Sequence, residues 1–146
     1  MKEVSLNDHK DEVLQLLTYL PWLEKKAGET ATRAYDGSDL TSTLPFMVYD
    51  TMLLNFVNDA SKTGLMNKNY LYAYSEQRLY TVEDEIEFID RATVKDAAVL
   101  CSILSKYVLG GMTKGALWGT AVQEGVFLAV LKKMKRLLEI WDAPLA

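Results

Sequence analysis

The feature that most constrains this chain is an apolar repeat near its C-terminus, which has the spacing of one α-helical face. Apolar side chains recur there every three or four residues, so they lie on a single stripe of a helix with 3.6 residues per turn. The members of the repeat are Phe127, Val130, Leu131, Met134, Leu137, Leu138 and Trp141. We expect this helix, with the two helices before it, to form the stable centre of the fold.

Weaker repeats of the same kind predict further helices along the chain. Thr81 with Asp84, and Thr93 with Asp96, match the capping pattern in which a hydroxyl and a later acid bind the first free backbone N–H groups of a helix. Pro21 is expected to end or kink the first helix, because proline lacks a backbone N–H. The predicted helices begin near residues 6, 45, 82, 94, 114 and 126.

These patterns predict an all-α fold: a bundle of five or six helices around one core, in a single domain over residues 1–146. Residues 28–44 are rich in Gly, Ser, Thr and Asp and lack apolar periodicity, so we expect an exposed connection there. Pro45 suits the first position of the helix that follows this connection.

The stretch from about residue 68 to residue 80 is ambiguous. Tyr70, Tyr72 and Tyr74 alternate with Leu71 and Ala73, and alternation of this kind is typical of a strand. The pattern favours irregular or short extended structure, with a short hairpin or a helical segment as the alternatives.

Composition places the chain among ordinary globular proteins. Hydrophobic residues make up 49% and charged residues 25% of its 146 residues, so it holds enough apolar surface to fold. No apolar run reaches the roughly 18–20 residues that span a bilayer, and the polar start is unlike a signal peptide. The single cysteine, Cys101, fits a reducing compartment. We therefore expect a soluble, cytoplasmic protein without membrane association.

Residues for metal or nucleophilic chemistry are few and scattered. Zinc sites and catalytic pairs need Cys and His side chains close together, whereas this chain has only His9 and Cys101, which are far apart in sequence. It lacks the glycine-rich loops that bind phosphates. Glu83, Glu87 and Asp90 share one helix face that could hold a divalent ion, but a solvated face is the simpler interpretation. We assign no catalytic residue, metal ligand or cofactor.

Gly111, Gly115 and Gly119 recur at four-residue steps and form the most unusual local pattern. Glycine inside a helix costs up to about 1 kcal/mol relative to alanine, so a neighbouring backbone or a ligand is expected to approach this face closely. Tight helix packing is one interpretation. The other is a small pocket bordered by Trp118, which makes Gly115, Trp118 and Gly119 the candidate ligand-binding residues.

Lys132, Lys133, Lys135 and Arg136 form a basic strip on the outer face of the last predicted helix. This strip is a candidate contact for a partner protein or for phosphate groups, and the alternative is a solvated face near a helix C-terminus. Nucleic-acid binding is disfavoured, because the chain carries a net charge of −4. The helix pair over residues 94–124 also offers few side chains of the kind that read bases.

Two parts of the chain carry a resemblance to a known family. Residues 93–138 include VKDAAVLCSILSKYVLGG, WGTAVQEG and VFLAVLKKMKRL, and residues 46–74 include VYDTMLLNFVNDASKTGLMNKNYLYAY. These segments resemble a family of small bacterial proteins that is known as a domain of unknown function. Leu109-Gly110-Gly111 replaces the more basic turn expected at that point, which argues against an anion site there. The resemblance implies no activity and no catalytic residues.

The absence of converging reactive groups, together with broad apolar helix stripes, favours a non-catalytic protein-interaction or regulatory module of a bacterial cell. Its partner would be another protein or a second copy of the chain. One alternative is a small-ligand binder or enzyme with a pocket near Gly115, Trp118 and Gly119. The second is nucleic-acid binding through the basic face of the C-terminal helix.

Overall fold

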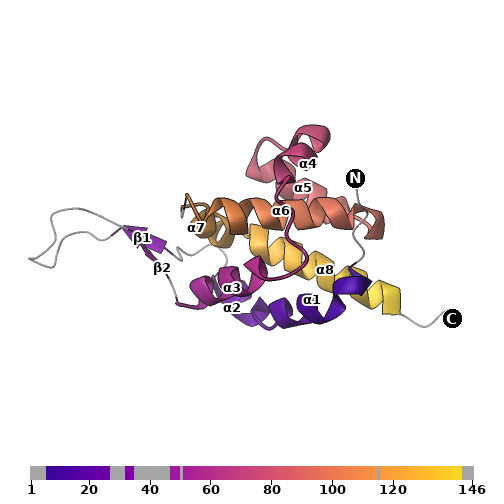
Figure 1. Cartoon of the computed structure of the whole chain (residues 1–146), viewed down its shortest axis with the longest axis horizontal. Coiled ribbons are helices and arrows are strands. Elements are labelled where there is room, and N and C mark those ends of the chain that lie inside the picture. The colour runs from indigo at the N-terminus through magenta and orange to yellow at the C-terminus, as the bar shows by residue number, and fades with distance from the viewer. Residues whose placement is uncertain (1–5, 27–31, 35–46, 50, 115, 143–146) are drawn as a thin grey trace, which may run out of the picture.

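The C-terminal helix α8 (Val126–Asp142) runs through the middle of the molecule, as Figure 1 shows. Its apolar stripe is buried as the sequence predicts, although the side chain of Trp141 lies outside the described part. The helices that pack most extensively against it are α1 (Lys10–Leu17), α2 (Leu20–Lys26), α5 (Val82–Arg91), α6 (Ala97–Gly110) and α7 (Ala116–Gln123). This one amphipathic helix therefore organises most of the core.

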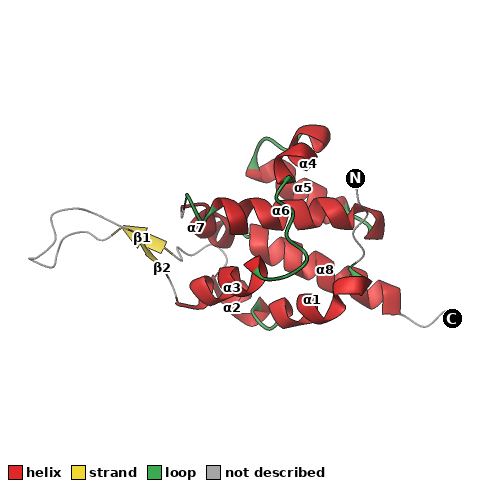
Figure 2. Cartoon of the chain, in the orientation of Figure 1, coloured by secondary structure: helices red, strands yellow, loops and turns green. Residues whose placement is uncertain are grey.

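The structure is a computed structural model that describes residues 6–26, 32–34, 47–49, 51–114 and 116–142. Within these ranges it has eight α-helices, two one-turn 3-10 helices (Asn7–His9 and Val94–Asp96) and one two-stranded ribbon (Figure 2). The predicted all-α bundle is confirmed, with more helices than the five or six expected. None of the helices in the described ranges is long and apolar enough to cross a bilayer.

One of the additional helices arises where the predicted first helix is divided. Helix α1 ends at Leu17, and α2 begins at Leu20, immediately before Pro21. Proline lacks the N–H that a continuous helix would need at this position, but its fixed φ angle suits the first turn of a new one. The predicted break at Pro21 is therefore confirmed as the start of a separate helix.

The other additional helix is α4 (Tyr70–Gln77), so the extended or hairpin segment predicted for residues 68–80 is wrong. Tyr70 and Tyr74 are four residues apart, a spacing that fits one helix face as well as one strand face. Burial decides between the two, because Ala73 and Tyr74 are buried while Leu71 and Tyr72 are exposed. Helix α4 then ends at Arg78, which adopts a left-handed conformation with φ 56°.

A two-stranded antiparallel ribbon replaces part of the predicted connection. Strand β1 (Thr32–Ala34) pairs with β2 (Met47–Tyr49), with Arg33 opposite Val48. Figure 1 shows the ribbon at one end of the bundle, where β1 contacts α7. Residues 27–31 and 35–46 lie outside the described residues, so the exposed connection predicted for 28–44 stays a prediction for most of its length.

The helix predicted to start at Pro45 begins later than expected. Helix α3 (Thr51–Ser61) follows β2, and Pro45 itself lies outside the described residues. Met47, Val48 and Tyr49 include the β-branched and aromatic types that pack well in strands. Pairing with β1 therefore determines the structure of this segment, and the apolar helix repeat applies only from Thr51 onward.

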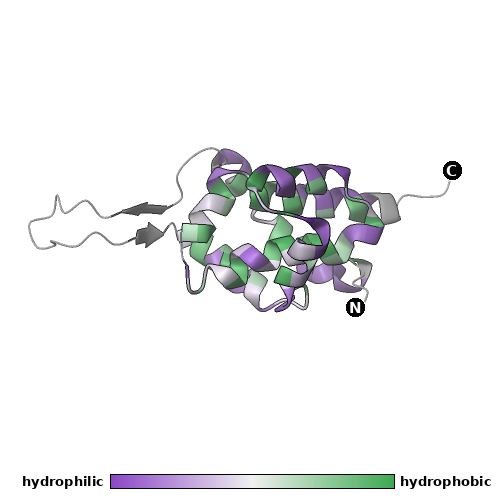
Figure 3. Ribbon diagram, turned by 90° about the horizontal axis from the view of Figure 1, so that it is seen from above, coloured by the Kyte–Doolittle hydropathy of each residue, from purple (hydrophilic) through white to green (hydrophobic). Residues whose placement is uncertain are grey.

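Aromatic side chains join three helices at the centre of the core. The ring centroids of Phe56 on α3 and Phe127 on α8 are 4.8 Å apart, and those of Tyr107 on α6 and Phe127 are 6.1 Å apart. Figure 3 shows the helices with hydrophobic and hydrophilic residues on the same element, as expected of amphipathic helices around a shared core. Both predicted capping boxes, Thr81 with Asp84 and Thr93 with Asp96, are present.

Candidate functional site

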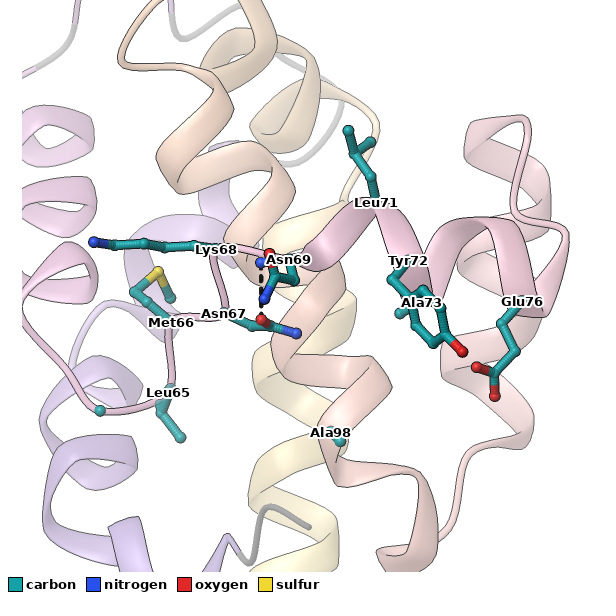
Figure 4. Close-up of a pocket in the computed structure, with 11 residues that line it drawn as sticks. Leu65, Met66, Asn67, Lys68, Asn69, Leu71, Tyr72, Ala73, Glu76 and Ala98 are labelled. Carbon is teal, nitrogen blue, oxygen red and sulfur yellow. Dashed lines mark hydrogen bonds between the residues drawn. The ribbon is translucent and has the colours of Figure 1, made fainter. Parts of the chain in front are cut away.

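A groove of about 940 Å³ opens between helix α4 and the loop that leads to it from α3, above the N-terminal half of α6 (Figure 4). We call it the α4 groove. The residues that line it are Gly64, Leu65, Met66, Asn67, Lys68, Asn69, Leu71, Tyr72, Ala73, Glu76 and Ala98. This groove is the candidate functional site, and none of the sequence patterns predicts it.

The loop wall of the groove is fixed to α6 by Asn67. Its backbone N–H donates to Ser105 Oγ at 2.8 Å, and its side-chain Nδ2 donates to Ser102 Oγ at 3.0 Å. The Asn67 Oδ1 atom in turn accepts the backbone N–H of Asn69 at 2.9 Å. Leu65 is buried beside these contacts, so the loop is anchored by both polar and apolar groups.

The helix wall of the groove carries large apolar side chains in contact with solvent. Leu71 is 68% exposed and Tyr72 is 65% exposed, while the neighbouring Ala73 faces the interior. Tyr80, just beyond the end of α4, is 77% exposed. Single exposed apolar residues are common, but adjacent ones on the rim of a concave surface are typical of a binding site.

Two opposite charges stand apart in the groove. Figure 4 shows Lys68 on the loop wall and Glu76 on the far side of Tyr72, near the end of α4. Both residues are exposed, so water solvates their charges. The polar lining therefore offers a cation and an anion at separate places, with amide groups between them.

Below the groove, a buried carboxylate holds α4 in place. Glu85 on α5 is 1% exposed, and each of its oxygens accepts a hydrogen bond from a tyrosine hydroxyl. Tyr74 of α4 donates to Oε2, and Tyr107 of α6 donates to Oε1 at 2.6 Å. Lys106 Nζ lies 3.6 Å from Oε2 and 4.6 Å from the centroid of the Tyr74 ring. We call these four residues the Glu85 cluster.

The two tyrosine hydroxyls of the Glu85 cluster keep their protons. Burial is the main cause that raises the pKa of the Tyr74 and Tyr107 hydroxyls, and the adjacent Glu85 carboxylate raises both further. Both hydroxyls therefore remain protonated donors over the physiological pH range. Because its hydrogen bonds are directed at one another, the cluster joins α4, α5 and α6.

Glu85 is not part of the solvated acidic face that the sequence predicts for this helix. Glu83, Glu87 and Asp90 are exposed as expected. Glu85, however, lies three residues before Phe88 and four before Ile89, which puts it on the buried stripe of α5. An acid at an apolar helix position was the signal that could have identified it.

Trp118 of the predicted glycine-lined pocket packs between α6 and α7. Its Nε1 donates to the backbone oxygen of Val108 at 3.1 Å. The ring also fills the space beside Gly111, where an added Cβ would lie 2.0 Å from Nε1. Gly119 is buried and Gly115 lies outside the described residues. The α4 groove includes neither Trp118 nor Gly119, so the predicted ligand site and the observed groove are separate places.

The predicted basic strip lies on the surface of α8, largely beside partners from the same chain. Lys132 Nζ is 3.8 Å from a Glu24 carboxylate oxygen, and Arg136 is 3.9 Å from Glu139. Lys133 Nζ donates to the backbone oxygen of Asp90 at 2.8 Å, and Lys135 is exposed. Exposed pairs of this kind contribute little stability and do not converge on one binding point.

The lone histidine and cysteine lie in different surroundings. His9 Nδ1 is 2.8 Å from Glu12 Oε1, and Glu12 Oε2 accepts the backbone N–H of Gly64 at 2.8 Å. Cys101 is buried on α6. Among the residues that the structure describes, no group of three His, Cys, Asp or Glu side chains could hold a metal ion.

Cys101 is expected to be unreactive in the folded protein. Burial raises the pKa of its thiol to about 12, so almost no thiolate forms at neutral pH, and the thiolate is the reacting species. A water-soluble aromatic disulfide, which releases a coloured thiol when a cysteine attacks it, should therefore react slowly with the native protein. The same reagent should react rapidly with the protein in urea. Free cysteine at the same concentration is the control, and rapid reaction of the native protein would contradict the buried position.

No protein-family model, curated protein or solved structure is significantly similar to this chain. The resemblance of residues 46–74 and 93–138 to a family of small bacterial proteins therefore stays a prediction. The assignment of a function rests on the geometry of the chain itself.

Proposed function

We propose that the protein is a non-catalytic interaction module of the bacterial cytoplasm that binds a segment of a partner protein in the α4 groove. The observation that carries this proposal is the exposure of Leu71 and Tyr72 on the rim of a large groove. Leaving the apolar surface of these two side chains in water is unfavourable by about 25 cal/mol for each Å² of accessible area. A partner that covers it would gain that free energy on binding.

The hydrogen bonds that hold the two walls of the groove favour a role in binding. The hydrogen bonds from Asn67 fix the loop wall, and the hydrogen bond from Tyr74 to Glu85 fixes the helix wall. The loop wall is thus held on α6 and the helix wall on α5, and together they define a concave surface. Binding sites whose walls are already held lose less conformational entropy when a partner arrives.

The chemistry of the lining also favours recognition over catalysis. The polar side chains of the described lining are those of Asn67, Asn69, Lys68, Tyr72 and Glu76. Asn67 is committed to hydrogen bonds that hold the loop, and Lys68 and Glu76 are solvated charges at separate places. Such groups can orient a peptide through hydrogen bonds and ion pairs, whereas general acid–base work needs a titrating group held close to the reacting atoms. The buried thiol of Cys101 supports the cytoplasm as the compartment.

Photo-crosslinking in cells tests the proposed interaction. With benzoylphenylalanine in place of Tyr72, we expect irradiation to yield a discrete adduct with one partner protein, because this side chain stands on the groove rim. The control carries the same photoreactive residue in place of Leu14, which is 46% exposed on α1 and is not part of the groove lining. Identical adducts at both positions, or none at position 72, would overturn the proposal.

A further inference from the structure

We infer that the segment that occupies the α4 groove belongs to a second copy of this chain, so that the protein forms a symmetric dimer through α4. The inference rests on the interaction function proposed above and names its partner. Leu71 and Tyr72 stand exposed on the rim, next to a hollow of about 940 Å³. A face that carries both a projection and a hollow can pair with itself, because each copy then places its exposed side chains in the groove of the other.

The outer face of α4 has charges at its two ends and apolar side chains between them. Lys68, in the turn before the helix, and Leu71, Tyr72 and Glu76 are exposed and line the groove. Residues three or four positions apart lie on the same side of a helix. The face therefore has a cation at one end, an anion at the other end and an apolar centre (Figure 4).

The order of the charges along this face is the one that a two-fold axis requires. Lys68 and Glu76 are each four residues away from Tyr72. When two α4 helices lie antiparallel across an axis near Tyr72, Lys68 of each copy lies opposite Glu76 of the other, so the same ion pair forms twice. Parallel helices in register would instead place like charges opposite each other. The ion pairs set the orientation of the two copies, while burial of Leu71 and Tyr72 stabilises the dimer.

Both charges are available for such pairs. Lys68 and Glu76 are exposed, and none of the ion pairs found among the described residues includes either of them. The two charges cancel, so the lining has no net charge that would attract a strongly basic or strongly acidic segment. A second copy supplies an opposite charge for each of them at the same time.

Charge reversal tests the inference, with sedimentation equilibrium of the full chain at low ionic strength over about 1–500 μM protein. We expect the parent to form a dimer as its concentration rises. Lys68→Glu and Glu76→Lys should each weaken the dimer about tenfold, because symmetry turns two attractive pairs into two repulsive ones. An equimolar mixture of these two variants should form a mixed dimer about as tightly as the parent, because each pair again joins opposite charges.

Three further variants are the controls. Lys135→Glu and Glu124→Lys make the same changes in net charge at exposed positions outside the groove lining, and each should dimerise within about twofold of the parent. The double variant Leu71→Ala/Tyr72→Ala should stay monomeric with an unchanged circular dichroism spectrum, because it removes exposed apolar side chains and leaves the core intact.

The outcomes distinguish this inference from the interaction function. If the purified protein stays monomeric while the photoreactive residue at position 72 yields an adduct with a different protein in cells, the second copy is overturned and the interaction function stands. A monomer without any adduct at that position would overturn both. The inference also fails if the dimer persists in Leu71→Ala/Tyr72→Ala, or if mixing the two charge variants does not restore it, because the contact would then lie elsewhere or have another geometry.

Discussion

Replacing Glu85 with alanine should lower the free energy of unfolding by about 3–5 kcal/mol, as removal of one member of a buried charged network does. The carboxylate accepts the hydroxyls of Tyr74 and Tyr107 and lies 3.6 Å from Lys106 Nζ. Without it, both buried hydroxyls lose their acceptor, and each unsatisfied group costs about 1–3 kcal/mol. Lys106 is partly exposed and can turn toward water, so most of the loss comes from the tyrosines. Urea unfolding followed by circular dichroism measures the effect.

Glu83→Ala is the matched control for this substitution. It removes the same side chain from the same first turn of α5, at an exposed position, and should change the stability by no more than about 0.5 kcal/mol. Glu85→Gln provides an intermediate variant, because the amide oxygen still accepts one tyrosine hydroxyl while its NH₂ group accepts none. If Glu85→Ala cost no more than Glu83→Ala, the Glu85 cluster would not hold α4 in place.

Gly111→Ala should destabilise the protein by about 1–3 kcal/mol, the usual cost of overfilling a packed site. Helix propensity alone predicts the opposite sign, because Gly111 follows α6 with right-handed helical angles and alanine is favoured over glycine there by up to about 1 kcal/mol. Packing decides the sign. A Cβ at this position would lie 2.0 Å from Trp118 Nε1 and 2.1 Å from Cδ1, so the indole ring must move and its hydrogen bond to Val108 must lengthen or break.

Gly110→Ala tests the same substitution one residue earlier. Its added Cβ would lie 3.1 Å from Leu117 Cδ1, the mobile end of a flexible side chain that can shift by a few tenths of an ångström. We expect this variant to be neutral or slightly stabilising, so the two neighbouring glycines should differ in the sign of their effect on the midpoint of thermal unfolding. Equal effects at both positions would show that Trp118 does not limit the space beside Gly111.

Local patterns in the sequence were sufficient to predict most of the helices. The repeat from Phe127 to Leu138 and the capping pairs before α5 and α6 are each specified within a few turns of chain, so no tertiary information is needed to find them. The break at Pro21 is local in the same sense, because it follows from the missing N–H. For these elements the periodicity and the capping chemistry agree, and the structure follows both.

The predictions that failed depend on contacts between distant residues. Tyr74 lies on a buried helix face because its hydroxyl reaches Glu85, eleven residues away in sequence. Met47 to Tyr49 form a strand because Thr32 to Ala34 lie opposite them. The tyrosine alternation and the apolar run after Pro45 were each compatible with two periods, and only the tertiary partner selects one.

The α4 groove could not be predicted from the sequence for a related reason. It forms where Asn67 contacts Ser102 and Ser105, which are 35 and 38 positions away in the sequence. No pattern in the loop sequence predicts that contact. The candidate residues that the sequence did suggest were chosen for their chemical type. The groove is instead defined by shape, which arises only when the loop and α4 settle on α6.

The serine pair beneath Asn67 has a consequence for how fast a complex would form and dissociate. Ser102 and Ser105 each donate to a carbonyl one turn earlier on α6, at 3.0 Å and 2.6 Å, and also accept a donor from Asn67. These bonds hold the loop wall of the α4 groove in the absence of a partner, so binding does not require a loop to close. For the interaction proposed above, differences in affinity among partner segments should therefore reside in their dissociation rates, while their association rates stay similar.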